Sequence, residues 1–276
     1  MAHILILGLG DLGTGLAQAL MRDGHRVSAI RRRNEAPPGV DLYAQDILEG
    51  TPLLPPDQVD LLYIILTPDG RDEAAYQRVF LGAPARLLDA LAGQQPLPPV
   101  VFVSSTAVYG EAEGTVDELT PPRPARFNGR ILLAAEEEIS LRTVGTSVRF
   151  SGIYGPGRLR LLRQVDAIAG GEAPPAPVLT NRIHSADCVG LLRHLGERWL
   201  KNDAPPAVVI GTDECPVSNI EVLNWLGERT GHPLGLVVPD QVPGRAVHSE
   251  YLGGGQYRLL HPDYRSGYQA VLQTLQ

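Results

Sequence analysis

Short apolar runs alternate with helical patterns through the first half of the chain. The runs that have the composition of buried strands are Ile4–Leu7, Arg26–Ile30, Val40–Ala44, Asp60–Leu66, Val100–Ser104 and Thr146–Phe150. Between them, helical spacing of apolar residues covers Leu12–Arg22, Asp72–Ala92 and Arg130–Leu141. We expect Gly82 and Pro84 to break the second helix in two. This alternation predicts an α/β fold, a Rossmann-type doubly wound parallel sheet with helices on both faces.

The pattern changes after Gly155-Pro156-Gly157. Helices are expected over Leu159–Ala169, Ala186–Leu200 and Asn219–Arg229, with a strand at Ala207–Ile210 and a tail rich in Gly, Pro and Tyr. We therefore predict a sheet domain over residues 1–156, to which residues 182–216 return. A small C-terminal substrate lobe would comprise residues 157–181 and 217–276.

The first strand runs directly into a glycine-rich turn, residues 8–13, and a helical pattern follows at once. This order is typical of the turn that binds the pyrophosphate of a dinucleotide. Gly8 would permit the tight turn, Gly10 would leave room for the cofactor, and Gly13 would let the helix pack on the strand. The helix N-terminus, with Asp11 and Leu12, would offer free N–H groups to the phosphates. A glycine-rich surface turn without a ligand is the alternative.

The second strand is followed by Arg31-Arg32-Arg33, where an NAD-binding turn carries an acidic residue. Since a guanidinium suits a 2′-phosphate, Arg31 and Arg32 predict NADP(H) in preference to NAD(H). A solvated arginine cluster is the alternative. Asp46 is placed to meet the adenine edge, although a plain turn aspartate would look the same. Thr67 and Ser104, at the ends of two later strands, are assigned to the same cofactor site.

A third motif follows the fifth strand, Val103-Ser104-Ser105-Thr106-Ala107-Val108-Tyr109-Gly110. Together with the glycine turn, residues 149–157 and the stretch from Arg182 to Asp187, it resembles the extended short-chain dehydrogenase/reductase superfamily, which includes nucleotide-sugar epimerases and dehydratases. The resemblance covers most of the chain. It implies that Ser105 is the catalytic serine, which hydrogen-bonds the reacting oxygen of the substrate. A strand-capping serine is the alternative.

The chain departs from that superfamily at its Tyr-x-x-x-Lys pair, in which the tyrosine transfers a proton and the lysine lowers its pKa. Asn128 stands at the tyrosine position and Leu132 at the lysine position. A shift of one residue gives Phe127 and Ile131, so neither alignment restores the pair. The sequence therefore resembles an atypical branch of the superfamily with a non-standard active site.

Substitute groups for the missing pair can be named. Tyr109, Tyr154 and His184 are candidate acid–base groups, and Tyr109 is assigned to the catalytic group with Ser105 and the Asn128 position. Candidate substrate contacts are Thr106, Arg130, Tyr154, Arg158 and His184. Each has a structural alternative: the two tyrosines can shape the floor of the site, the arginines can be solvated, and His184 with Asp187 can cap a helix. No metal is expected, because His184 and Cys188 alone make a poor ligand set.

Composition narrows the classes of function. The chain has 276 residues and a net charge of −7, which argues against a nucleic-acid groove. Lys201 is the only lysine, so neither a P-loop nor a Schiff-base centre can be assembled. No apolar run approaches the ~20 residues that span a bilayer, and two cysteines without a C-x-x-C spacing favour a reducing compartment. We therefore expect a cytoplasmic protein without a membrane partner, and leave open whether it forms a homodimer.

Two functions remain in competition, beside a third possibility that the pocket binds no dinucleotide. The first is an NADP(H)-dependent oxidoreductase or epimerase-like enzyme acting on a small polar molecule, a class that includes sugar-derived and nucleotide-linked compounds. The second is a non-catalytic NADP(H)-binding sensor or scaffold. The missing Tyr–Lys pair favours the second hypothesis and the retained Ser105 favours the first.

Overall fold

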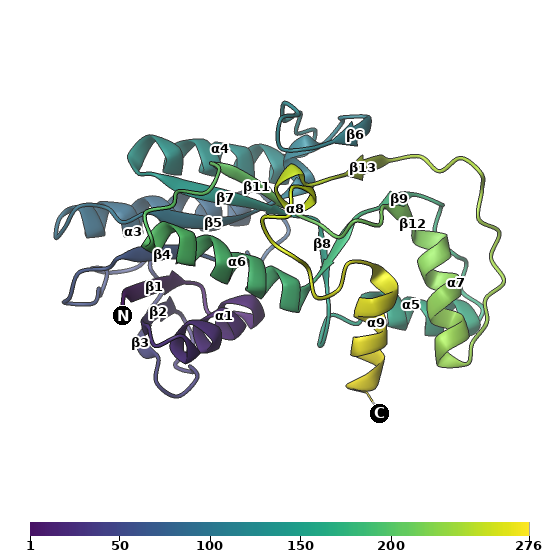
Figure 1. The fold of residues 1–276 in the computed structure, drawn as a ribbon, viewed down its shortest axis with the longest axis horizontal. Coiled ribbons are helices and arrows are strands. Elements are labelled where there is room, and N and C mark those ends of the chain that lie inside the picture. The colour runs from purple at the N-terminus through teal and green to yellow at the C-terminus, as the bar shows by residue number, and fades with distance from the viewer. Residues whose placement is uncertain (276) are drawn as a thin grey trace. The chain divides into compact units, whose positions relative to one another are not determined.

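The central sheet has seven strands in the order β11–β7–β5–β4–β1–β2–β3 (Figure 1). Their bounds in the computed structural model, which describes residues 1–275, are β1 His3–Leu7, β2 Arg26–Arg31, β3 Asp41–Ala44, β4 Leu61–Ile64, β5 Val100–Ser105, β7 Gly145–Phe150 and β11 Val208–Gly211. The pairs β3–β2, β2–β1, β1–β4 and β4–β5 are parallel. Every residue of β1 and β4 is buried, as expected for central strands of a sheet that is covered on both faces.

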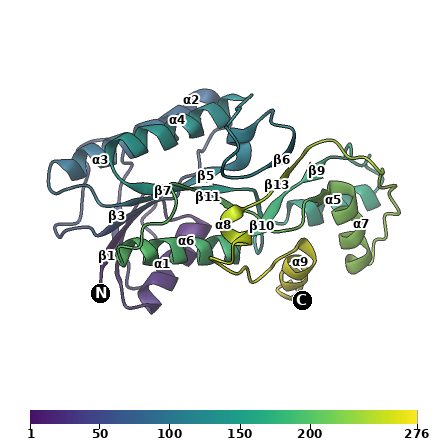
Figure 2. The ribbon, with the colours of Figure 1, turned by 45° about the horizontal axis from the view of Figure 1, so that its top comes forward.

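Helices cover the two faces of this sheet (Figures 1 and 2). On one face lie α1 (Asp11–Arg22) and α6 (Ser185–Leu200); on the other lie α3 (Ala83–Ala92) and α4 (Phe127–Arg142). Helix α6 approaches β4 closely, because a β-carbon at Gly196 would lie 1.7 Å from the Tyr63 hydroxyl. That hydroxyl donates to the Leu192 carbonyl oxygen at 3.0 Å. The predicted doubly wound α/β fold is confirmed.

The expected break at Gly82 and Pro84 takes a different form. The chain is helical throughout, as α2 (Glu73–Gln77), a π-helical segment η1 (Arg78–Gly82) and α3. Pro84 stands in the first turn of α3, and its missing N–H and its ring exclude the regular i to i−4 bond at this point. The wider π turn accommodates this without ending the helix.

The described residues divide into two compact units, and the boundary differs from the expected one. Unit 1 comprises residues 1–111, 121–149 and 189–209; unit 2 comprises residues 112–120, 150–188 and 210–275. Residues 112–120, 150–156, 182–188 and 210–216 therefore group with the lobe, although Phe150 and residues 210–211 end strands β7 and β11 of the central sheet. The reason is local strand pairing, since β8 (Gly152–Tyr154) pairs with β10 (Arg182–His184) and β6 (Gly114–Val116) with β13 (Arg245–Val247).

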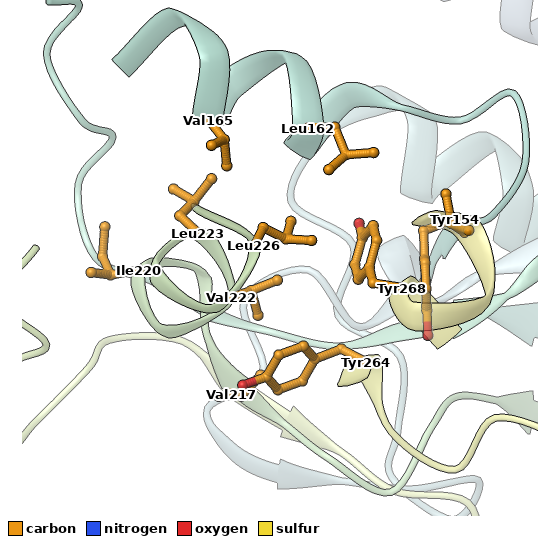
Figure 3. Close-up of a cluster of buried hydrophobic side chains, with 11 residues drawn as sticks. Tyr154, Leu162, Val165, Val217, Ile220, Val222, Leu223, Leu226, Tyr264 and Tyr268 are labelled. Atoms are coloured by element: carbon orange, nitrogen blue, oxygen red, sulfur yellow. The ribbon is translucent and has the colours of Figure 1, made fainter. Parts of the chain in front are cut away.

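Unit 2 has its own hydrophobic core between three helices, α5 (Arg160–Ala169), α7 (Asn219–Thr230) and α9 (Tyr264–Gln273). Figure 3 shows Val165, Leu223, Leu226 and Tyr268 converging in this cluster. Helix α9 lies in the tail rich in Gly, Pro and Tyr, where no helix was predicted, although Tyr264, Tyr268 and Val271 follow a helical spacing. It also missed the pair β9 (Leu179–Thr180) and β12 (Val217–Ser218), the short α8 (Glu250–Gly253) and the turn η2 (Thr106–Tyr109), which are too short to leave a periodic signal.

Within residues 1–275, no helix combines the length and the apolar character that crossing a bilayer requires.

Candidate functional site

The glycine turn is held tightly between the ends of two strands of unit 1. The Gly8 amide donates to the Ile30 carbonyl oxygen at 3.0 Å, and a β-carbon at Gly8 would lie 2.0 Å from the Ile65 oxygen. Gly8 also has φ +98°, which disfavours any other residue. A β-carbon at Gly13 would lie 2.3 Å from the Gly8 oxygen, so α1 packs directly on the turn. Gly10 differs, because nothing lies within 4 Å of its β-carbon position.

A cavity of about 430 Å³ opens beside this turn, a volume within the usual range of small-molecule sites. Its wall includes the predicted residues Gly8, Gly10, Arg31, Arg32, Asp46 and Thr67. Helix α1 begins at Asp11 with Gly10 at its N-cap, and since Gly10 lines the cavity, the positive end of the helix dipole adjoins it. Asp11 Oδ1 accepts from the neighbouring Leu12 amide at 2.9 Å, and Leu12 is buried in the core.

The wall of this cavity also carries charged side chains that were not predicted as site residues. Arg33, Asp69 and Arg78 join Arg31, Arg32 and Asp46 around the cavity. Four arginines against two aspartates leave two positive charges in excess. Arg33 stands in the basic run itself, but Asp69 and Arg78 arrive from the segment that follows β4. No local pattern marks those two residues as part of the site.

The arginines differ in their partners. Arg32 grips both carboxylate oxygens of Asp69, with Nη2 at 2.6 Å from Oδ1, and this hydrogen-bonded pairing lowers the pKa of Asp69. Arg78 lies 3.3 Å from Asp46 Oδ2. Arg31 donates to the backbone oxygen of Glu35 at 2.7 Å and forms no ion pair with residues 1–275.

Arg33 makes no hydrogen bond or ion pair with any residue from 1 to 275. The excess charge therefore resides on Arg31 and Arg33. The sequence reading paired Arg31 with Arg32 instead.

Ser104 and Tyr109 take part in a buried polar network. Ser104 is buried and donates to Glu136 Oε1 at 2.5 Å. Tyr109 is 0% exposed, and its hydroxyl accepts from Arg149 Nη1 at 2.9 Å. Arg149 in turn donates to Glu136 Oε2 at 2.6 Å, which closes a buried polar network in unit 1. Both side chains are held in this network, and neither residue lines the cavity beside the glycine turn.

Ser105 and Asn128 lie on neighbouring segments of unit 1. Ser105 Oγ accepts from the Ala107 amide at 3.2 Å and caps the turn η2. Asn128 is half-buried in the first turn of α4, which meets η2 closely because a β-carbon at Gly129 would lie 2.5 Å from the Ala107 oxygen. Leu132 is 5% exposed and packs in the core, so an apolar side chain fills the lysine position.

Two further candidates of unit 1 have structural contacts. Thr106 is buried in η2. Arg130 is exposed, and its Nη1 donates to the Ala125 backbone oxygen at 2.9 Å. Neither residue lines the cavity.

Tyr154, Arg158 and His184 belong to unit 2. Tyr154 is buried, donates to the Asp263 backbone oxygen at 3.3 Å and stacks on Tyr268, and burial raises its pKa. The Arg158 amide donates to the Gly155 oxygen at 3.0 Å. None of these contacts marks a substrate site.

His184 is buried, and burial lowers its pKa to about 4. Its Nδ1 faces the Ala186 amide at 3.2 Å, so a neutral ring carries its proton on Nε2. His184, Asp187 and His261 have ligand atoms within 4.8 Å of one another, a grouping that the sequence did not reveal. The Asp187 carboxylate accepts from the Leu260 and His261 amides and thereby holds that loop.

The family of the chain follows from comparison with known proteins. Residues 4–169 match the model of the NAD dependent epimerase/dehydratase family. The chain belongs to this family. The match spans the glycine turn, both arginine-bearing segments of the cavity and the Ser105 motif. It supports an atypical member of the short-chain dehydrogenase/reductase superfamily, because the Tyr–Lys pair is missing.

Several known proteins resemble this member of the epimerase/dehydratase family along most of its length. Protein YeeZ of Escherichia coli (strain K12) is 31% identical over 70% of this chain and 72% of its own. A structure from Methylobacillus flagellatus, whose description names the NAD-dependent epimerase/dehydratases, is 33% identical, with a TM-score of 0.83 over 99% of this chain and 98% of that one.

At 16% identity, the Bordetella bronchiseptica enzyme WbmG, solved in complex with NAD and UDP, shares the fold. Its TM-score is 0.76 over 98% of this chain and 93% of its own.

Proposed function

We propose that this epimerase/dehydratase-family protein binds NADP(H) in the cavity beside the glycine turn, in preference to NAD(H). The observation that supports this choice is that Arg31 and Arg33 form no ion pair within residues 1–275, on a wall with two excess positive charges. The 2′-phosphate carries close to two negative charges at neutral pH, so it matches that excess. The 2′-hydroxyl of NAD(H) is neutral and gains nothing from it.

The glycine turn supports the other half of the proposal. With Gly8 and Gly13 in contact with neighbouring backbone and Gly10 facing open space, the pyrophosphate would approach Gly10 and the N-terminus of α1. Arg31 and Arg33 would then hold the 2′-phosphate, while Asp46 and Thr67 would line the adenosine.

The reaction we propose is of the epimerase or reductase type on a small polar substrate. Ser105 would hydrogen-bond the reacting oxygen, and Asn128 would stand beside it without the ability to transfer a proton as tyrosine does. A nucleotide-linked or sugar-derived substrate is supported by WbmG, whose structure contains UDP as well as NAD.

A non-catalytic sensor or scaffold is the second candidate. It is supported by the burial of Leu132 and Tyr109, since neither the lysine position nor the tyrosine of the Ser105 motif then offers an accessible acid–base side chain.

Fluorescence titration with NADPH and NADH tests the cofactor assignment. We expect NADPH to bind more tightly by roughly 1–3 kcal/mol, the scale of charge-assisted hydrogen bonds, and Arg31→Ala/Arg33→Ala to remove the difference. The charge-matched double variant Arg22→Ala/Arg193→Ala lies outside the cavity wall and should keep it. Equal affinities of the unmodified protein for the two cofactors would contradict the assignment.

A further inference from the structure

Asp69 places a carboxylate in the cavity that we assign to the dinucleotide. Its two oxygens engage the two terminal nitrogens of Arg32, and this is the only side-chain hydrogen bonding of Asp69 within residues 1–275. Both partners are more than half exposed, at 54% for Arg32 and 67% for Asp69. The pair can therefore open without disturbing the core.

The second aspartate on the wall is tied more firmly. Asp46 faces Arg78 through Oδ2, but its Oδ1 accepts from the Leu48 amide at 3.0 Å and so belongs to its own turn. Of the two carboxylates, Asp69 is the one whose position depends on an arginine alone.

The Asp69 carboxylate opposes a phosphate in two ways. It occupies the fork of Arg32, the edge on which a phosphate would form two parallel hydrogen bonds. It also adds a negative charge to the wall that the phosphate must approach. A dinucleotide with a free 2′-hydroxyl neither needs the Arg32 guanidinium nor places a second negative charge beside Asp69.

We propose that Asp69 lowers the preference for a 2′-phosphorylated cofactor by competing with the 2′-phosphate for Arg32. This inference rests on the proposed NADP(H) site. In the free protein Arg32 is held by Asp69, and Arg31 and Arg33 make the first contact with the phosphate. Asp69 thereby keeps the preference for a 2′-phosphorylated cofactor below the level that the arginines alone would give.

Two adenosine fragments isolate the effect, because they differ only in the 2′-phosphate: adenosine 2′,5′-bisphosphate and 5′-AMP. Calorimetric titration of the full chain with each fragment compares Asp69→Ala with the unmodified protein. We expect the bisphosphate to bind Asp69→Ala about three- to tenfold more tightly, from a released ion pair and a removed like charge, with 5′-AMP unchanged. Asp57→Ala is the matched control, since Asp57 also pairs with an arginine, Arg26, but lies outside the cavity wall.

The outcomes separate the inference from the function on which it rests. Failure of the unmodified protein to bind either fragment would remove the proposed site itself. If both fragments bind but Asp69→Ala leaves the bisphosphate affinity unchanged, Asp69 does not affect binding. If the affinity falls, Asp69 holds Arg32 in place for the phosphate. Either result contradicts the proposal that Asp69 competes with the 2′-phosphate. In an Arg32→Ala background the gain should shrink, because the released guanidinium is missing. A gain of undiminished size would show that Asp69 does not act through Arg32.

Discussion

Gly10 offers the sharpest test of where the ligand binds, because a side chain there meets nothing in the protein. The backbone at Gly10 has φ −76° and ψ −159°, an extended conformation open to any L-residue. Nothing lies within 4 Å of the added β-carbon. Gly10→Ala should therefore change the free energy of unfolding by no more than about 0.5–1 kcal/mol, and a gain is as reasonable as a loss.

Binding of a dinucleotide should respond very differently. If the pyrophosphate approaches Gly10, the methyl group of Gly10→Ala occupies part of the space that the phosphates need, and Gly10→Val occupies more. We expect NADPH affinity to fall about tenfold for alanine and at least a hundredfold for valine, or about 1.4 and 2.7 kcal/mol. A loss of NADPH affinity with an unchanged fold would therefore indicate that the pyrophosphate lies beside Gly10.

Fluorescence titration measures the affinity, and circular dichroism with thermal unfolding measures the fold. Gly93→Ala is a matched control: Gly93 has φ −72°, its β-carbon would make only ordinary contacts, the nearest at 3.5 Å, and it lies outside the cavity wall. It should alter neither measurement. Gly8→Ala should damage both, since its β-carbon would collide with the Ile65 oxygen. NADPH binding of wild-type strength in Gly10→Val would refute the placement of the pyrophosphate.

Three further predictions concern catalysis, the buried network and pH. The double variant Asn128→Tyr/Leu132→Lys should raise NADPH-dependent carbonyl reduction above the wild-type level, whereas neither single change should do so. Ser105→Ala should slow any natural turnover about 10²-fold in steady-state assays. If turnover does not respond to Ser105→Ala, the active centre lies elsewhere. Glu136→Ala should lower the free energy of unfolding by about 3–5 kcal/mol in urea titrations, because the buried Arg149 loses its counter-charge; a loss below 1 kcal/mol would contradict this. Burial raises the pKa of Asp213 from 3.8 to about 7, so between these values the folded chain holds a proton that the unfolded chain has lost. The contribution of Asp213 to the free energy of unfolding should therefore decline by up to about 1.4 kcal/mol per pH unit as the pH rises through this window. In Asp213→Asn, the free energy of unfolding should depend less steeply on pH.

Several features of this protein could be predicted from the order of its residues. The apolar runs predict the seven strands of the central sheet to within a few residues, because burial on both faces leaves a continuous apolar signal in central strands such as β1 and β4. The glycine turn was equally visible, since the spacing of Gly8, Gly10 and Gly13 reflects backbone requirements within a few residues. The missing Tyr–Lys pair is also a property of the sequence alone.

The partners of the polar side chains were decided only by the tertiary structure. Arg32 meets Asp69 because parallel pairing places β1 between β2 and β4, so the segments following β2 and β4 reach one cavity although they are far apart along the chain. Ser104 and Tyr109 look like site residues in the sequence, yet Glu136 from α4 and Arg149 from β7 hold both of them in the interior. Local patterns specify backbone conformation and burial, whereas the pairing of charges depends on which distant segments the folded sheet brings together.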